Sequence, residues 1–249
     1  ASRQLREAIF LVFVARQEFD QARDFLARLD PDERYLFARA RGTTGRELER
    51  IRVRDHAAFA YSLASLHIAE GEYADAMRVI DRSLEQNEAF FDSFPLPEGE
   101  NPKTARFTLD GRLRARRASI LSLQGHHADA LANFEMSGVL EVIDLMLDRI
   151  AGQVGAPPSR EVLELYLAQE ADFESRFMLM SYRASFAVAA ELAMRVGDAN
   201  KAAAYFEKSL IFPNGDDWSF YEQSSRWVGV SLGIADEEWR ERALTDAEC

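Results

Sequence analysis

The sequence predicts an all-α protein assembled from repeated pairs of helices. Apolar residues recur at helical spacing along most of the chain, as at Leu140, Ile143, Leu147 and Ile150. No segment sustains the alternation of apolar and polar residues, rich in β-branched types, that marks a strand. A short pattern, in which alanine follows a turn residue by five positions, recurs between amphipathic segments. We therefore expect more than about two-thirds helix and no sheet.

The composition of the 249-residue chain is that of a core-forming protein. Hydrophobic residues make up 47% and charged residues 29%, which excludes the disordered and collagen-like classes. The single cysteine excludes a disulfide framework and a cysteine-based zinc site. The formal net charge of -12 disfavours nonspecific binding to nucleic acid or to an anionic membrane.

The longest apolar run, Ala8 to Ala15, is far shorter than the roughly 18 residues that span a bilayer, so we expect no membrane insertion. The chain opens at Ala1 rather than at methionine, which suggests a processed protein or a piece of a longer one. The compartment stays open, with the cytoplasm favoured.

Several polar residues and glycines have the spacing of helix ends. Asp30 followed by Pro31 predicts a helix start, with Asp30 as the cap and proline at the first helical position. Thr44 and Glu47 have the spacing of a capping box, and Ser159 and Asp198 are further caps. Helices should stop at the glycines at 42, 71, 125, 155 and 197.

Two proline- and glycine-rich segments predict long connections. Ser93 to Lys103 holds three prolines and should be a mobile loop or one beside a groove. Gly152 to Pro158 separates two stretches that both carry the helical pattern. We therefore expect one domain over residues 1–249, with a possible joint at 152–158.

The recurring pattern predicts four helical hairpins. Its turn residues, 54, 54 and 72 residues apart, are Gln17, Gly71, Gly125 and Gly197. The alanines five positions later are Ala22, Ala76, Ala130 and Ala202, and the large apolar residues four further on are Leu26, Ile80, Phe134 and Phe206. In three copies a small residue stands seven positions before the glycine, at Ala64, Ala118 and Ala190. The small residues let the two helices of a hairpin approach closely, and the larger one fills the gap to the next hairpin.

These residues resemble the tetratricopeptide repeat (TPR) family, whose unit has a small residue in its first helix, glycine at the turn, and alanine then an aromatic in its second. The resemblance implies a right-handed α-solenoid of about ten to twelve helices that binds a protein or peptide in a concave groove. The family repeats about every 34 residues, so extra helices must intervene here, for example over Glu33–Arg41 and Ser137–Ala151.

A cluster of five arginines interrupts the acidic background of the chain. It comprises Arg106, Arg112, Arg114, Arg116 and Arg117, with only Asp110 opposing it in sequence. Arg112 and Arg116 are one helical turn apart on the helix before Gly125, and the resemblance implies that such helices line the groove. The partner-binding residues expected there are Arg112, Arg116, Tyr61, Ser65 and Ser119, and an acidic segment is the ligand that suits paired guanidinium groups.

Members of the family that grip a C-terminal carboxylate use further Lys and Asn residues in the preceding repeats. Here those places hold Glu7, Leu11 and Ser62. The full clamp is absent, which argues against a standard chaperone-tail adaptor. Surface arginines paired with acids on neighbouring helices are the simpler interpretation of the cluster.

No catalytic, cofactor-binding or metal-binding residues are expected, since no phosphate-binding loop, nucleophile elbow or His-Glu-x-x-His motif occurs. Asp144 and Asp148 have the spacing of a Mg²⁺ pair, but their one loose counterpart, Asp216-Asp217, looks like a helix cap. His67 and the pair His126-His127 are expected as ordinary helix and turn residues.

Two groups of aromatic residues serve either as partner anchors or as seals of loops and solenoid ends. They are Phe90, Phe91 and Phe94, and Trp218, Phe220, Tyr221 and Trp227.

The sequence thus predicts a noncatalytic interaction scaffold. The alternatives are a ligand-sensing or regulatory module of a larger protein, and an enzyme on a helical scaffold, which would show a deep pocket with converging acids.

Overall fold

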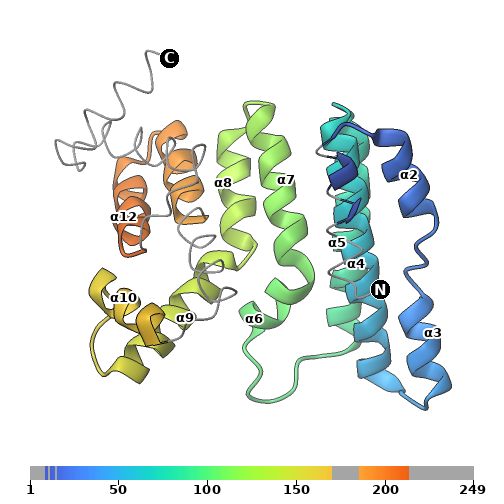
Figure 1. The fold of residues 1–249 in the computed structure, drawn as a ribbon, viewed down its shortest axis with the longest axis horizontal. Helices are drawn as coiled ribbons and strands as arrows, with labels where there is room; N and C mark the ends of the chain where they lie inside the picture. The colour runs from blue at the N-terminus through green and yellow to red at the C-terminus, as the bar shows by residue number, and fades with distance from the viewer. Residues whose placement is uncertain (1–8, 11, 15, 170–184, 213–249) are drawn as a thin grey trace. The chain divides into compact units, whose positions relative to one another are not determined.

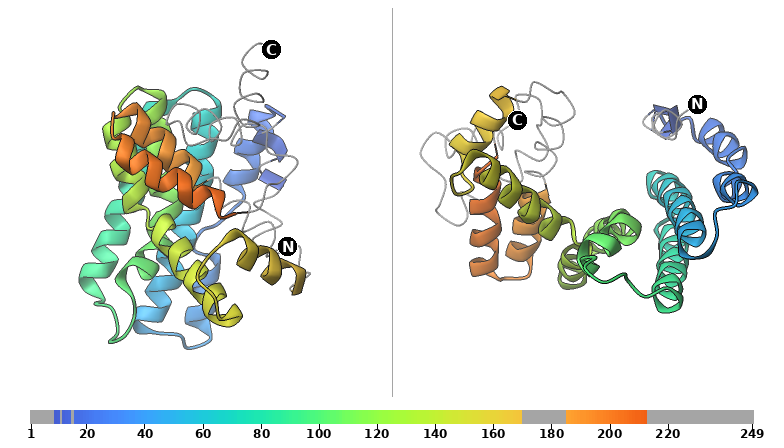
Figure 2. Two further views of the ribbon diagram at one scale, coloured as in Figure 1. Left: turned by 90° about the vertical axis from the view of Figure 1, so that its left-hand side faces the viewer. Right: turned by 90° about the horizontal axis from the view of Figure 1, so that it is seen from below.

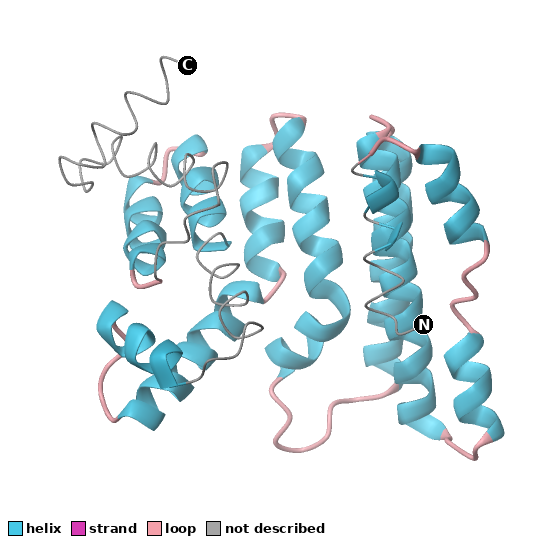
Figure 3. Cartoon of the chain, in the orientation of Figure 1, coloured by secondary structure: helices cyan, strands magenta, loops and turns pink. Residues whose placement is uncertain are grey.

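The computed structural model describes residues 9–10, 12–14, 16–169 and 185–212, and this part of the chain is all-α, as predicted. Helix accounts for 79% of it, without a strand among the described residues (Figure 3). The helices, labelled in Figure 1 except for the π-helical turn η1, have the following bounds: α2 (Phe19–Ala27), α3 (Glu33–Ala40), α4 (Gly45–Ala69), α5 (Tyr73–Ser93), α6 (Pro102–Arg106), η1 (Phe107–Gly111), α7 (Arg112–Leu123), α8 (His127–Met136), α9 (Val139–Val154), α10 (Arg160–Gln169) and α12 (Ala199–Leu210). A further helix runs through 185–195. Among these helices none has both the length and the apolar character needed to cross a membrane.

The chain divides into two compact units. The first comprises Ala1–Gln124 and Met136–Gly138, and the second comprises Gly125–Glu135 and Val139–Cys249. Helix α9 continues to Val154 and α10 begins at Arg160, so the joint expected at 152–158 overlaps the end of α9, and it lies inside the second unit. A single continuous solenoid over the whole chain stays a prediction.

In the first unit, α4 and α5 lie side by side as an antiparallel pair, as Figures 1 and 2 both show. Helix α7 packs against both of them. The buried residues that join the three helices are Ala57, Ala60, Ala64, Ala76, Ile80, Leu113 and Ile120. Four of these seven are alanines, and their small side chains permit the close approach of α4 to its neighbours.

The four predicted turns share one local geometry. Gln17, Gly71, Gly125 and Gly197 all have positive φ, at 59°, 79°, 82° and 82°. At three of the turns the residue after this position donates its N–H to the carbonyl five residues back: Glu18 to Phe13 (2.9 Å), Glu72 to His67 (2.8 Å) and Asp198 to Ala193 (2.9 Å). These are the bonds of a Schellman cap.

The residues that define the predicted hairpins are all buried. The alanines after the turns, Ala22, Ala76, Ala130 and Ala202, are fully buried, and Leu26, Ile80, Phe134 and Phe206 are at most 7% exposed. Ala64, Ala118 and Ala190, in the preceding helices, are at most 2% exposed. The sequence pattern therefore marks positions where packing requires small or large side chains.

Two of the four predicted cap sites are confirmed. Asp198 accepts a hydrogen bond from the backbone N–H of Lys201 (3.0 Å), and Ser159 accepts one from Val162 (3.3 Å). Both residues stand immediately before a helix, where the first N–H groups lack intrahelical partners.

The other two cap predictions are wrong in detail. The Asp30 carboxylate accepts a hydrogen bond from the N–H of Asp32 (2.9 Å). This local turn ends before the helix starts, so α3 begins at Glu33 rather than at Pro31. Thr44 does precede α4, but its side chain forms no capping bond, and Glu47 pairs with Arg50 (2.9 Å).

The connection predicted at Ser93–Lys103 is shorter than expected. Helix α5 ends at Ser93, and α6 already begins at Pro102, since proline fits the first turn of a helix, where its missing N–H is not needed. From there α6, η1 and α7 follow without a gap. The π-helical turn η1 was not predicted, because the apolar spacing of one irregular turn hardly differs from that of an α-helix.

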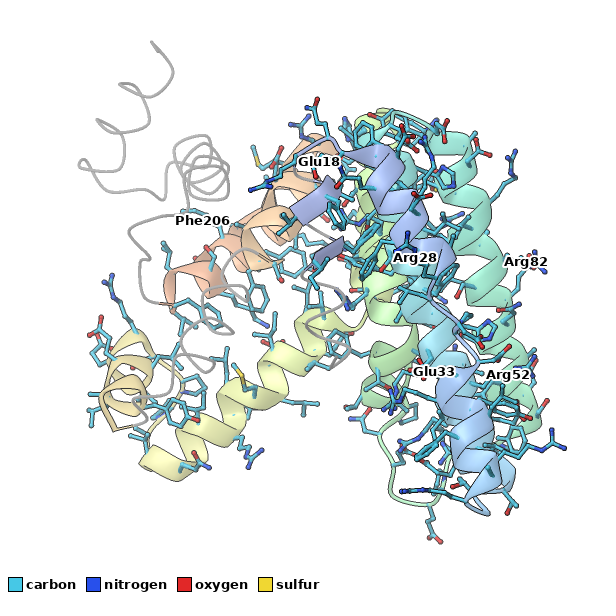
Figure 4. The ribbon with its side chains drawn as sticks, turned by 45° about the vertical axis from the view of Figure 1, so that its right-hand side comes forward. Glu18, Arg28, Glu33, Arg52, Arg82 and Phe206 are labelled. Atoms are coloured by element: carbon cyan, nitrogen blue, oxygen red, sulfur yellow. The ribbon has the colours of Figure 1, made fainter. Side chains whose placement is uncertain are left out.

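The second unit has its own core. The predicted stripe of α9 (Leu140, Ile143, Leu147 and Ile150) is buried, as is Phe206 of α12, which Figure 4 labels. Phe206 packs with Ala190 of the helix through 185–195.

Lys208 pairs with Asp144 (2.6 Å), so one of the two carboxylates considered for Mg²⁺ already has a cation partner.

Candidate functional site

The arginine cluster forms its most distinctive contacts around Tyr61, in the first unit. Helix α4 presents the tyrosine ring, and α7 presents Arg112 and Arg116 from adjacent turns of one face. The guanidinium carbons lie 4.1 Å (Arg112) and 4.9 Å (Arg116) from the centre of the ring, within cation–π range. Arg116 also donates a hydrogen bond to the tyrosine hydroxyl (2.7 Å). We call these three residues the Tyr61 arginine pair.

The other three arginines of the cluster are paired with carboxylates. Arg106 donates two hydrogen bonds to Glu88 (2.6 and 2.9 Å), an arrangement that lowers the pKa of Glu88 and raises that of Arg106. Arg117 donates to Asp81 (2.8 Å). Arg114 pairs with Asp110 (3.5 Å). For these three, the simpler interpretation of surface arginines neutralised by neighbouring acids is correct.

Arg116 differs from them, because among the described residues its partner is the neutral hydroxyl of Tyr61 rather than a carboxylate. A guanidinium group carries five N–H donors, so one bond to Tyr61 leaves others for a ligand. Arg112 is exposed, and Arg116 is partly so. The ring keeps the two cations on one face, and planar guanidinium groups of this kind match the geometry of a carboxylate.

A buried polar pair lies beneath the cluster. Asp110 and Asn87 are each 1% exposed, and Asn87 donates to the Asp110 carboxylate (2.7 Å) and to the backbone carbonyl of Leu109 (3.3 Å). Burial is the main cause of the raised pKa of Asp110. The Asn87 bond and the charges of Arg114 and Arg106 oppose that shift. Asp110 belongs to η1, so the irregular turn positions this carboxylate.

Sequence reasoning identified Asp110 as the one acid near the cluster but missed Asn87, Glu88 and Asp81. All three lie on α5, 18 or more residues before Arg106, the first arginine of the cluster. Nothing in the local pattern of α5 distinguishes the face that meets the cluster from its other polar positions, so no sequence signal could have found them.

The two serines expected at the site serve their own helices. Ser65 is 7% exposed, and its hydroxyl donates to the carbonyl of Tyr61 (2.7 Å). Ser119 is exposed, and its hydroxyl donates to the carbonyl of Ala115 (3.1 Å). The structure therefore brings together Tyr61, Arg112 and Arg116 and leaves Ser65 inside the fold. Of the positions compared with a carboxylate clamp, Glu7 and Leu11 lie outside the described residues.

The other candidates separate into several local groups. Phe90 is buried, and its ring centre lies 5.5 Å from those of Phe91 and Phe94. This packing fits the role of a seal at the end of α5. Trp218, Phe220, Tyr221, Trp227 and Asp216-Asp217 lie outside the described residues. His67 pairs with Glu72 (2.7 Å), and Glu70 lies close by. Among the described residues these three form the one group whose potential ligand atoms all lie within 4.8 Å of one another.

A pocket opens between α4 and the segments that precede it, also within the first unit. Its apolar lining includes Phe10, Leu29, Pro31 and Phe59. An ion pair between Arg34 and Asp55 (3.1 Å) supplies charged groups at the same pocket. Apolar walls with a few polar groups are typical of small-molecule sites.

Comparison of the chain with protein-family models, with curated proteins and with solved structures finds no match. What the protein binds is therefore inferred from its own residues.

Proposed function

We propose that the protein is a noncatalytic interaction scaffold of TPR-like helical hairpins that binds an acidic segment of a partner protein at the Tyr61 arginine pair. The observation that carries this proposal is the contact of two guanidinium groups, those of Arg112 and Arg116, with the ring of Tyr61. The positive φ shared by the four turns, and the cap hydrogen bond shared by three of them, support the repeat interpretation.

The charge distribution of the chain favours binding of an acidic ligand at the Tyr61 arginine pair over binding elsewhere on the surface. In a chain of net charge -12 most of the surface repels a carboxylate-rich segment. Arg112 and Arg116 supply a local positive charge, and their planar forks suit carboxylates bidentately. The scaffold is preorganised by its packed helices, so the main entropic cost of binding is the ordering of the ligand.

The experiment is affinity capture of partners by three proteins, followed by mass spectrometry. The three are wild type, Arg112→Ala/Arg116→Ala, and Arg78→Ala/Arg82→Ala. The last is a matched control, because Arg78 and Arg82 are two exposed arginines with the same spacing on α5 (Arg82 is labelled in Figure 4). The proposal is supported by a partner that binds through an acidic segment and that only Arg112→Ala/Arg116→Ala fails to capture. Partners retained equally by all three proteins contradict it.

The pocket between α4 and the preceding segments favours a second candidate, a ligand-sensing module. Apolar walls beside the Arg34–Asp55 ion pair suit a small molecule with an apolar body and one charged group. Thermal stabilisation by members of a small-molecule library, lost in Phe59→Ala and Arg34→Ala, would support it. Stabilisation that both variants retain would place the ligand elsewhere.

A further inference from the structure

We infer that the turn between α4 and α5 is a binding site for a divalent transition-metal ion such as Zn²⁺, held by His67, Glu70 and Glu72. One potential ligand atom from each residue lies within 4.8 Å of the other two. Ligands about 2.1 Å from a shared tetrahedral ion are about 3.4 Å apart, so shifts of about 1 Å close the site.

Glu70 provides the observation that points to a ligand. Its side chain is 8% exposed, and one carboxylate oxygen is paired with Arg23. The other oxygen, Oε2, is buried and has no hydrogen-bond partner. A buried carboxylate oxygen without a donor is costly in a folded protein, and a bound cation would satisfy it. Arg23 would then act as a neighbouring group that orients the ligand carboxylate.

His67 and Glu72 complete the donor set. Nδ1 of His67 donates to Oε2 of Glu72 over 2.7 Å. An ion bound between these atoms needs Nδ1 without its hydrogen, so the neutral ring would carry its one hydrogen on Nε2 instead. One imidazole and two carboxylates suit Zn²⁺ and its first-row neighbours, and water would fill the remaining position.

The backbone holds these residues in place before any ion arrives. The N–H of Glu72 donates to the carbonyl of His67 (2.8 Å), and the N–H of Gly71 donates to that of Ile68 (3.0 Å). Gly71 has φ of 79°, which a side chain would disfavour. The two carboxylates and Arg23 together carry a formal charge of -1, so a divalent cation is favoured electrostatically.

The test is titration of the full chain with Zn²⁺ by calorimetry, and with Co²⁺ by visible absorption. We compare wild type with His67→Gln and Glu72→Gln. Glu72 is 47% exposed, so its replacement should leave the fold intact, and circular dichroism of each variant checks this. The matched control is His126→Gln/His127→Gln, which removes the two histidines at the corresponding start of α8.

One equivalent of ion should bind to wild type and to the control. The affinity should fall at least about tenfold in each of the two site variants. The inference is overturned if wild type binds neither ion at about 1 mM. It is also overturned if the site variants bind as wild type does, or if binding is lost only in the control.

Discussion

The guanidinium group of Arg116 donates a hydrogen bond to the hydroxyl of Tyr61 over 2.7 Å, joining residues 55 positions apart in the sequence. The same ring lies beneath Arg112, so α7 is tied to α4 by a polar bond and by two cation–π contacts. This contact stabilises the first unit and also fixes the two cations in the geometry that an acidic ligand would meet.

Tyr61→Phe should therefore destabilise the first unit by about 1 kcal/mol, because it removes the acceptor of one hydrogen bond and keeps the ring. Urea unfolding followed by circular dichroism measures the change. Tyr73→Phe is the control, since Tyr73 packs on the same core and its hydroxyl forms no hydrogen bond within the described part of the chain. Equal stability of the two variants would contradict the assigned bond.

Ala76→Leu and Ala202→Leu should each destabilise the protein by about 1–3 kcal/mol, because both alanines are fully buried at hairpin crossings and a larger side chain overpacks them. Ala74→Leu and Ala204→Leu are the matched controls, on exposed positions of the same helices. If the buried and exposed substitutions cost the same in urea, the alignment of the hairpins is wrong.

Asp110→Asn should change how stability depends on pH. The pKa of Asp110 is raised by burial, so the folded state holds its proton more tightly than the unfolded state does. The stability that this proton contributes is present below the ordinary aspartate range, about pH 4, and is lost as the pH rises through the raised pKa. Relative to wild type, the variant should therefore become more stable between about pH 4 and neutrality.

Urea unfolding at a series of pH values measures this difference in free energy. Asp92→Asn, on an exposed position of α5, serves as the control. A difference between wild type and Asp110→Asn that stays constant across the series would show that the carboxyl does not titrate differently in the folded protein.

Two helical glycines should respond to alanine in opposite directions. A Cβ at Gly111 would lie 2.6 Å from Cδ2 of Phe107 and 3.0 Å from the carbonyl oxygen of Ser137, so Gly111→Ala should cost about 1–3 kcal/mol. A Cβ at Gly152, in α9, would meet nothing within 4 Å. Gly152→Ala should therefore stabilise its unit by about 0.5–1 kcal/mol through helix propensity. Thermal unfolding of the two variants distinguishes these effects, and a matching sign in both would refute the packing assigned to Gly111.

The hairpin turns could be predicted from the sequence because backbone geometry constrains their residues directly. Glycine at 71, 125 and 197 relieves the strain of a positive φ. The pattern even located the turn at Gln17, where a residue with a side chain adopts φ of 59°. There the buried Ala22 and Leu26 carry the signal, since packing fixes their sizes.

The surroundings of the arginine cluster could be predicted only in part. The spacing of Arg112 and Arg116 placed them on one helical face, but their common contact with Tyr61 depends on how α4 meets α7. Asn87 and Glu88 reach the cluster from α5 for the same reason. Such contacts are set by tertiary packing, which helical periodicity does not encode. At Thr44 the spacing predicted a capping box, but Glu47 pairs with Arg50 and the Thr44 side chain forms no capping bond.

The most direct test of the proposed function is a titration of a captured partner's acidic segment against wild type and Arg112→Ala/Arg116→Ala at about 50 and 300 mM salt. The account predicts that the variant binds more weakly by about 1–3 kcal/mol at low salt, and that salt weakens binding to wild type more than binding to the variant. The Arg78→Ala/Arg82→Ala control should bind as wild type does. Equal affinity of wild type and variant, with no dependence on salt, would show that the Tyr61 arginine pair is a structural contact and does not bind the ligand.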